Sequence, residues 1–151
     1  MGREAEADLA KALEFTTDSR ARLDVWLALG ANRENNLKDT AAALEAYQQI
    51  AAASKNNGSA TYYRGVQGAA RILRTSGKFD DALATLRKVD VAQLRGYWHG
   101  SILVALGETL TAAGRKGEAL AAYREVLTDN SVSAADRKAA EEAIKAIEAE
   151  L

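Results

Sequence analysis

Apolar residues recur along this chain at intervals of three and four, which is the pattern of helices that bury one face. No stretch shows the strict alternation typical of a half-buried strand. The pattern divides the chain into about eight helical segments joined by short polar stretches. The expected segments cover residues 3–15, 18–34, 38–55, 59–76, 78–89, 91–113, 115–129 and 133–151. The fold class is therefore predicted to be all-α.

Polar residues and glycines at the joints supply the expected helix starts and ends. Serine, threonine and aspartate side chains cap helix N-termini, and glycine accepts the positive φ that follows many helices. Asp90 has Gln93 three residues later, which resembles a capping box. A short helical turn is expected there before Gly96, with Tyr97 opening the next long helix. The other expected caps are Thr17 or Asp18, Ser59 and Ser133, and the expected positive-φ glycines are Gly58, Gly77 and Gly114.

Alanines recur at similar positions in successive segments. Ala82 follows Gly77 by five residues, just as Ala119 follows Gly114. Ala43 precedes Ala82 by 39 residues, close to the 37 between Ala82 and Ala119. A small side chain allows two helices to cross closely, where a larger one would push the backbones apart. We therefore expect these three alanines to mark the crossing points of successive helix pairs.

A longer motif surrounds these alanines. It consists of a Leu-Gly pair on one predicted helix, followed on the next by an alanine and, four residues later, an aromatic residue. The matching residues are Trp26-x2-Leu29-Gly30 with Ala43-x3-Tyr47, and Leu106-Gly107 with Ala119-x3-Tyr123, while Ala82-x3-Leu86 is a weaker copy. These elements resemble the tetratricopeptide repeat, a family of stacked antiparallel helix pairs.

The resemblance implies a right-handed α-α solenoid that forms one domain over residues 1–151. Its helix pairs would cover about 18–55, 59–89 and 91–129, with a partial repeat at 3–15 and a capping helix at 133–151. In such solenoids the first helices of the pairs line a concave groove that holds a peptide or a partner helix. The stretch from Gly77 to Leu127 is also similar to repeats of bacterial envelope and translocon-associated helper proteins.

Composition supports a folded chain and narrows the class of partner. Hydrophobic residues make up 48% and charged residues 27% of the 151 residues, as in ordinary globular domains. The net charge of -1 supplies no general attraction for nucleic acid. No apolar run is long enough to insert into a membrane, so we expect a soluble protein whose compartment the sequence leaves open. Cysteine is absent, which excludes disulfides and thiolate chemistry.

Motifs for catalysis are missing from the sequence. Lys78 after Gly77 lacks the flanking residues of a phosphate-binding loop. Gly65 and Gly68 fall within a predicted helix and are expected to mark a close helix crossing. His99 is the only histidine, so a metal site with two histidines is excluded, and a structural or surface role is expected for it. We expect no catalytic residues, no bound metal and no cofactor.

Four polar residues on one predicted helix form the first candidate partner-binding surface. Residues three, seven and ten positions apart lie on one side of a helix. The four are Arg64, Gln67, Arg71 and Arg74. Arginines at this spacing could bind the carboxylates of an acidic partner segment. Alternatively, Asp24, Glu34 and Glu108 on the flanking helices neutralise them.

Aromatic couples at two helix starts form the second candidate surface. Tyr62 and Tyr63 open one helix, and Tyr97 and Trp98 open another. Tyrosine and tryptophan are common at binding hot spots, which favours Tyr63, Tyr97 and Trp98 as partner contacts. Bulky residues at helix starts also seal one helix pair against the next, and at least one ring of each couple is expected to do so.

The sequence thus favours a non-catalytic interaction module that binds a protein or peptide, which could be acidic. The alternative is an architectural or self-associating segment of a larger protein, such as one of the cell envelope. An enzyme is the third and least favoured interpretation.

Overall fold

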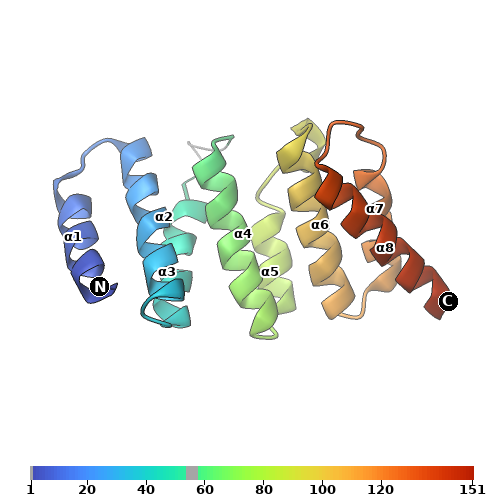
Figure 1. Ribbon diagram of the computed structural model, residues 1–151, viewed down its shortest axis with the longest axis horizontal. Coiled ribbons are helices and arrows are strands. Elements are labelled where there is room, and N and C mark those ends of the chain that lie inside the picture. Colours follow the sequence, from blue (N-terminus) through green and yellow to red (C-terminus); the bar gives the residue numbers. More distant parts are fainter. Residues whose placement is uncertain (1, 54–57) are drawn as a thin grey trace. The chain divides into compact units, whose positions relative to one another are not determined.

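The computed structural model describes residues 2–53 and 58–151, and every regular element in these ranges is a helix. Figure 1 labels the α-helices along the chain. They are α1 (Gly2–Phe15), α2 (Ser19–Asn35), α3 (Thr40–Ala51), α4 (Ala60–Thr75), α5 (Phe79–Leu86), α6 (Tyr97–Ala112), α7 (Lys116–Val126) and α8 (Ala134–Glu150), with a short 3-10 helix, η2 (Val91–Gln93), before α6. The predicted all-α class is confirmed for these residues.

The predicted boundaries agree with most of these helices to within one to three residues. The segment expected at 91–113 is divided as foreseen, because η2 forms a short turn and Gly96, with φ of 79°, redirects the chain before α6. Two segments end earlier than expected: α5 at Leu86 and α7 at Val126. The end expected for the third segment, at residue 55, lies outside the described residues.

Most predicted caps are present. Asp18 accepts a hydrogen bond from the Ala21 amide, and Ser133 accepts one from the Asp136 amide. Ser59 accepts one from the Tyr62 amide at the start of α4. The positive φ expected after three helices is found at Gly58, Gly77 and Gly114. The prediction of a capping box at Asp90 is wrong. The Asp90 side chain makes no capping hydrogen bond, and the segment that follows is only one turn of 3-10 helix.

The described residues form two compact units, one from residues 2–53 and 58–72 and the other from residues 73–151, and the boundary lies within α4. In the first unit α2 packs against both α1 and α3. The ring of Tyr47 on α3 lies against two glycines, Gly30 on α2 and Gly68 on α4. Gly65 lies against Ile50 in the same way, so the close helix crossing expected at Gly65 and Gly68 is confirmed.

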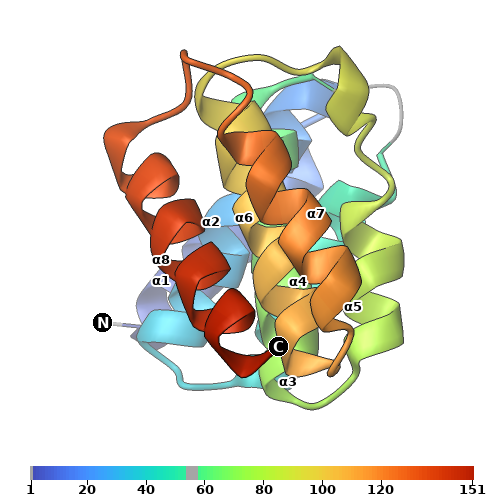
Figure 2. The same cartoon turned by 90° about the vertical axis from the view of Figure 1, so that its right-hand side faces the viewer.

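In the second unit α6 is the central helix and packs against α5, α7 and α8. Figure 2 shows α8 lying alongside α6 and α7. Gly107 of α6 receives the ring of Tyr123 from α7, and Gly100 lies against Val132 at the entrance to α8. Ala140 and Ile147 are the buried residues of α8, so this helix covers one side of the unit with a single apolar stripe.

The three alanines predicted to mark helix crossings are all fully buried. Ala43 lies in the first unit, and Ala82 and Ala119 lie in the second, each with 0% of its surface exposed. Their burial agrees with the need for small side chains where helices approach closely. The handedness of a solenoid and the prediction of one domain over residues 1–151 stay predictions.

Within the described residues, no helix combines the length and the apolar character needed to cross a membrane.

Candidate functional site

The predicted polar stripe lies on α4, and its arginines differ in their partners. In the first unit Arg71 is exposed and forms an ion pair with Glu34 of α2. In the second unit Arg74 is half-buried and donates a 2.6 Å hydrogen bond from Nη1 to Oε2 of Glu108 on α6. Both carboxylates are among those considered as neutralising partners, so this alternative is confirmed for Arg71 and Arg74.

The ion pair between Arg71 and Glu34 belongs to a larger network. The hydroxyl of Tyr47 donates a 2.8 Å hydrogen bond to the other carboxylate oxygen of Glu34. Burial acts to raise the pKa of Glu34, but the hydrogen bonds from Arg71 and Tyr47 outweigh it and lower this pKa below its ordinary value. Burial, reinforced by the bond to Glu34, raises the pKa of Tyr47 to about 12. The network therefore holds Glu34 charged and Tyr47 neutral at neutral pH.

Arg64 is the least engaged residue of the stripe. Its side chain is exposed, and it forms no ion pair within the part of the chain that the structure describes. Asp24, one of the acids considered as a neutralising partner, instead accepts a 2.6 Å hydrogen bond from Thr61. Gln67, one turn along from Arg64, is half-buried. Arg64 is consequently the stripe residue most available to an acidic partner.

The two aromatic couples differ in exposure. Tyr62 and Tyr63 meet edge to face, with ring centroids 5.8 Å apart, and Tyr63 is only 5% exposed. Tyr63 packs in the core of the first unit and is therefore removed from the candidate surface. Tyr97 and Trp98 also meet edge to face, at 4.8 Å, but Tyr97 is 57% exposed. Tyr97, supported by the half-buried Trp98, remains available for contact.

A cavity in the first unit was not predicted from the sequence. Its volume is about 380 Å³, and it lies between α2 and α3. Its lining residues are Trp26, Arg33, Glu45, Gln48 and Gln49. Arg33 is already engaged, since it donates hydrogen bonds to Glu6 of α1 and to the Ala42 carbonyl. Trp26 was noticed only as part of the repeat motif, and no sequence signal marked it as lining a cavity.

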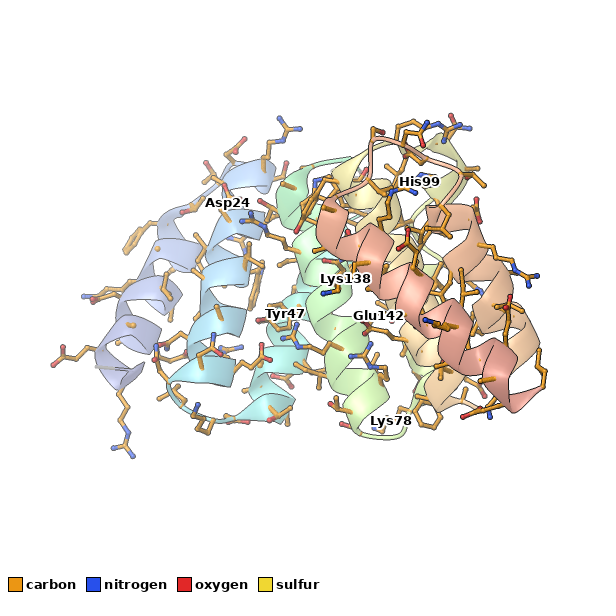
Figure 3. All side chains as sticks on the ribbon, turned by 45° about the vertical axis from the view of Figure 1, so that its right-hand side comes forward. Asp24, Tyr47, Lys78, His99, Lys138 and Glu142 are labelled. Carbon is orange, nitrogen blue, oxygen red and sulfur yellow. The ribbon has the colours of Figure 1, made fainter. Side chains whose placement is uncertain are left out.

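Figure 3 shows His99 at the start of α6, beside the connection between α7 and α8. The residue is only 3% exposed. Its Nδ1 lies 2.8 Å from Oδ2 of Asp129. Asp129 also accepts hydrogen bonds from the amides of Gly96 and Ser131 and from the Ser131 hydroxyl. The bond from the Ser131 hydroxyl, then those from Gly96 and His99, hold the pKa of Asp129 far below its ordinary value. The structural role expected for His99 agrees with this burial.

The Nε2 atom of His99 is buried and has no hydrogen-bond partner within the described residues. His99 and Asp129 both line a pocket of about 310 Å³. Its other lining residues are Ala92, Arg95, Glu125, Thr128 and Asn130. The sequence did not indicate this pocket, because its residues come from two separate stretches of the chain, 92–99 and 125–130.

Metal ligands do not gather at either cavity. Over residues 2–53 and 58–151, no group of three or more histidine, aspartate or glutamate side chains is arranged to hold a metal ion.

No protein-family model matches the chain, and searches of curated proteins and of solved structures found no match.

Proposed function

We propose that this protein is a non-catalytic interaction module built from tetratricopeptide-like helix pairs in a right-handed solenoid. One observation carries the proposal: the same helix-pair packing occurs in each unit. Gly30 receives the ring of Tyr47 in the first unit, and Gly107 receives that of Tyr123 in the second. Repeated helix pairs of this kind form preformed binding surfaces whose ordering costs little on association.

The proposed partner is a protein segment that carries acidic residues. In the first unit Arg64 supports this choice, because its guanidinium is exposed and unpaired among the described residues. A guanidinium matches the geometry of a carboxylate with two parallel hydrogen bonds. In the second unit the exposed ring of Tyr97 offers an apolar contact of the type that dominates binding energy.

A peptide selection tests the proposal directly. The protein would serve as bait for a random-peptide display library, and the affinities of selected peptides would be measured by fluorescence anisotropy. We expect enrichment of aspartate and glutamate, and weaker binding to Arg64→Glu. Arg64 is the informative position because its replacement breaks no ion pair, whereas replacing Arg71 would also disturb Glu34.

Matched variants separate this site from general charge effects. Arg20→Glu makes the same charge change at another exposed position and should bind as the unchanged protein does. Tyr97 is tested as a separate contact on the second unit: Tyr97→Ala should weaken binding, whereas Phe15→Ala, which removes another exposed ring, should not. Failure to select any peptide, or equal binding to Arg64→Glu and Arg20→Glu, would reject the proposed surface.

An architectural role is the second candidate, and α1 favours it. This helix has no buried residue, and Phe15 at its end is 77% exposed. Such a face could be covered by a second copy or by another domain. Sedimentation velocity tests self-association: a concentration-dependent dimer that Phe15→Ala weakens would support it, and a monomer at every concentration would argue against it.

A further inference from the structure

His99 lines the pocket of about 310 Å³ and carries a buried hydrogen-bond acceptor that nothing in the described residues satisfies. Asp129 is ionised, so its carboxylate can only accept, and Nδ1 of His99 must donate the 2.8 Å bond between them. In the neutral ring this bond leaves Nε2 with a lone pair and no proton. His99 is only 3% exposed, and Nε2 lacks a partner. A buried acceptor of this kind is costly unless a donor reaches it.

Two opposite charges line the same pocket without an ion-pair partner among the described residues. Arg95 donates from Nη1 to the carbonyls of Leu94, at 2.6 Å, and Ala92, at 3.3 Å. These bonds hold the guanidinium in place and leave its other N–H groups available. Glu125 is exposed and unpaired, although the preceding Arg124 forms an ion pair with Glu148 of α8.

We propose that this pocket binds a small zwitterion, namely a free α-amino acid. The ligand's ammonium group would donate to Nε2 of His99 and pair with Glu125, while its carboxylate would pair with Arg95. An ammonium has three donors and no acceptor, which suits one imidazole lone pair together with one carboxylate. The guanidinium fork suits the carboxylate at the other end of the ligand.

Size and charge favour a free amino acid over a peptide. A volume of about 310 Å³ is at the lower end for small-molecule pockets, which typically run from about 300 Å³ upwards. A small molecule with an ammonium and a carboxylate would pair with both charges, whereas the backbone of an internal peptide segment supplies neither group. This inference is independent of the proposed interaction with a protein partner, because none of its residues lies on α4 and Tyr97 takes no part in it.

The single histidine makes the site directly observable. With ¹⁵N-labelled histidine, the only ring signals in the spectrum come from His99. L-alanine would be titrated as the probe, beside alanine amide, which retains only the ammonium, and N-acetylalanine, which retains only the carboxylate. We expect a saturable shift of Nε2 with L-alanine, and binding of each single-charge analogue weaker by about tenfold or more.

Surface variants complete the test without disturbing the buried pair. Arg95→Gln and Glu125→Gln should each weaken L-alanine binding by about tenfold or more, because each removes one charged hydrogen bond. Arg124→Gln, a neighbouring exposed position outside the pocket, should bind as the unchanged protein does. The proposal is overturned if no probe gives a saturable shift, which would mean that only an ordered water reaches Nε2. It is equally overturned if either analogue binds the unchanged protein as well as L-alanine does. The same holds if either pocket variant binds L-alanine as well as the unchanged protein does.

Discussion

Gly107 of α6 lies directly under the ring of Tyr123 on α7. A Cβ atom added at Gly107 would lie 2.5 Å from Cζ of that ring, closer than such atoms approach in folded proteins. The first unit repeats the arrangement, since a Cβ at Gly30 would lie 2.5 Å from Cε1 of Tyr47. In both units the absence of a side chain on the first helix of a pair allows the aromatic ring of the second to pack against its backbone.

The first prediction concerns this contact. Gly107→Ala should lower the free energy of unfolding by about 1–3 kcal/mol, because the methyl group forces the buried ring of Tyr123 out of place. Gly117→Ala is the matched control. It lies in α7 with no atom within 4 Å of the added Cβ, so it should be neutral or slightly stabilising. Urea unfolding measures both, and equal stability of the two variants would show that the ring accommodates the methyl group.

The second prediction tests the alanines at the helix crossings. Ala119→Leu should destabilise the protein by about 1–3 kcal/mol, because Ala119 is fully buried between helices that cannot separate without losing other contacts. Ala121→Leu places the same side chain on the exposed face of the same helix and should change stability little. Thermal unfolding of the two variants gives the comparison. A tolerated leucine at position 119 would mean that the crossing does not depend on a small residue.

The sequence predicted helices and crossing points well because both depend on local pattern. Periodicity located α1 to α8, and alanine spacing identified Ala43, Ala82 and Ala119 as buried. Local pattern was less informative at Asp90, where a short motif did not predict the side-chain contact. Asp90 and Gln93 looked like a capping box, but the chain makes only one turn there and leaves the cap unused.

The candidate sites were harder to predict because they depend on tertiary contacts. The acids near the stripe were foreseen, but only the structure assigns Glu34 to Arg71 and Glu108 to Arg74. Nothing in the sequence around Asp129 indicates that it meets His99, 30 residues earlier. Such pairs form when separate loops converge, and their residues carry no shared periodicity.

The third prediction concerns the pH dependence conferred by Glu34. Its folded pKa lies below the ordinary 4.5, so the carboxylate stabilises the fold above that pH and loses this effect as the pH falls through the folded pKa. Glu34→Gln should cost about 1 kcal/mol at neutral pH, a modest value because the group is partly exposed. As the pH falls below the ordinary 4.5 and through the lower folded pKa, the difference from the unchanged protein should shrink because Glu34 becomes protonated.

Urea unfolding across this pH range measures the effect. Glu45→Gln, an exposed change on α3, is the control and should follow the unchanged protein at every pH. A deficit of Glu34→Gln that stays constant through acid pH would show that the charge of Glu34 is not what stabilises the network with Arg71 and Tyr47.

The fourth prediction concerns Asp129, whose carboxylate joins the start of α6 to the connection before α8. Asp129→Asn replaces one acceptor oxygen with an N–H donor, so the amides of Gly96 and Ser131 can no longer both be satisfied. We expect faster hydrogen exchange at one of these amides. If the new amide faces His99, its ring should also adopt the tautomer with the proton on Nε2, which ¹⁵N spectra of the single histidine would detect.

The pH dependence of this contact follows from the sign of the shift. Because the folded pKa of Asp129 is depressed, its contribution to stability is present above the ordinary value of 3.8 and is lost only as the pH falls through the much lower folded pKa. Protection of the Gly96 amide should therefore persist in mild acid in the unchanged protein. Asp90→Asn makes the same substitution at a side chain without a capping bond and should leave that protection intact. Equal protection at Gly96 in Asp129→Asn and Asp90→Asn would show that the carboxylate does not hold these two segments together.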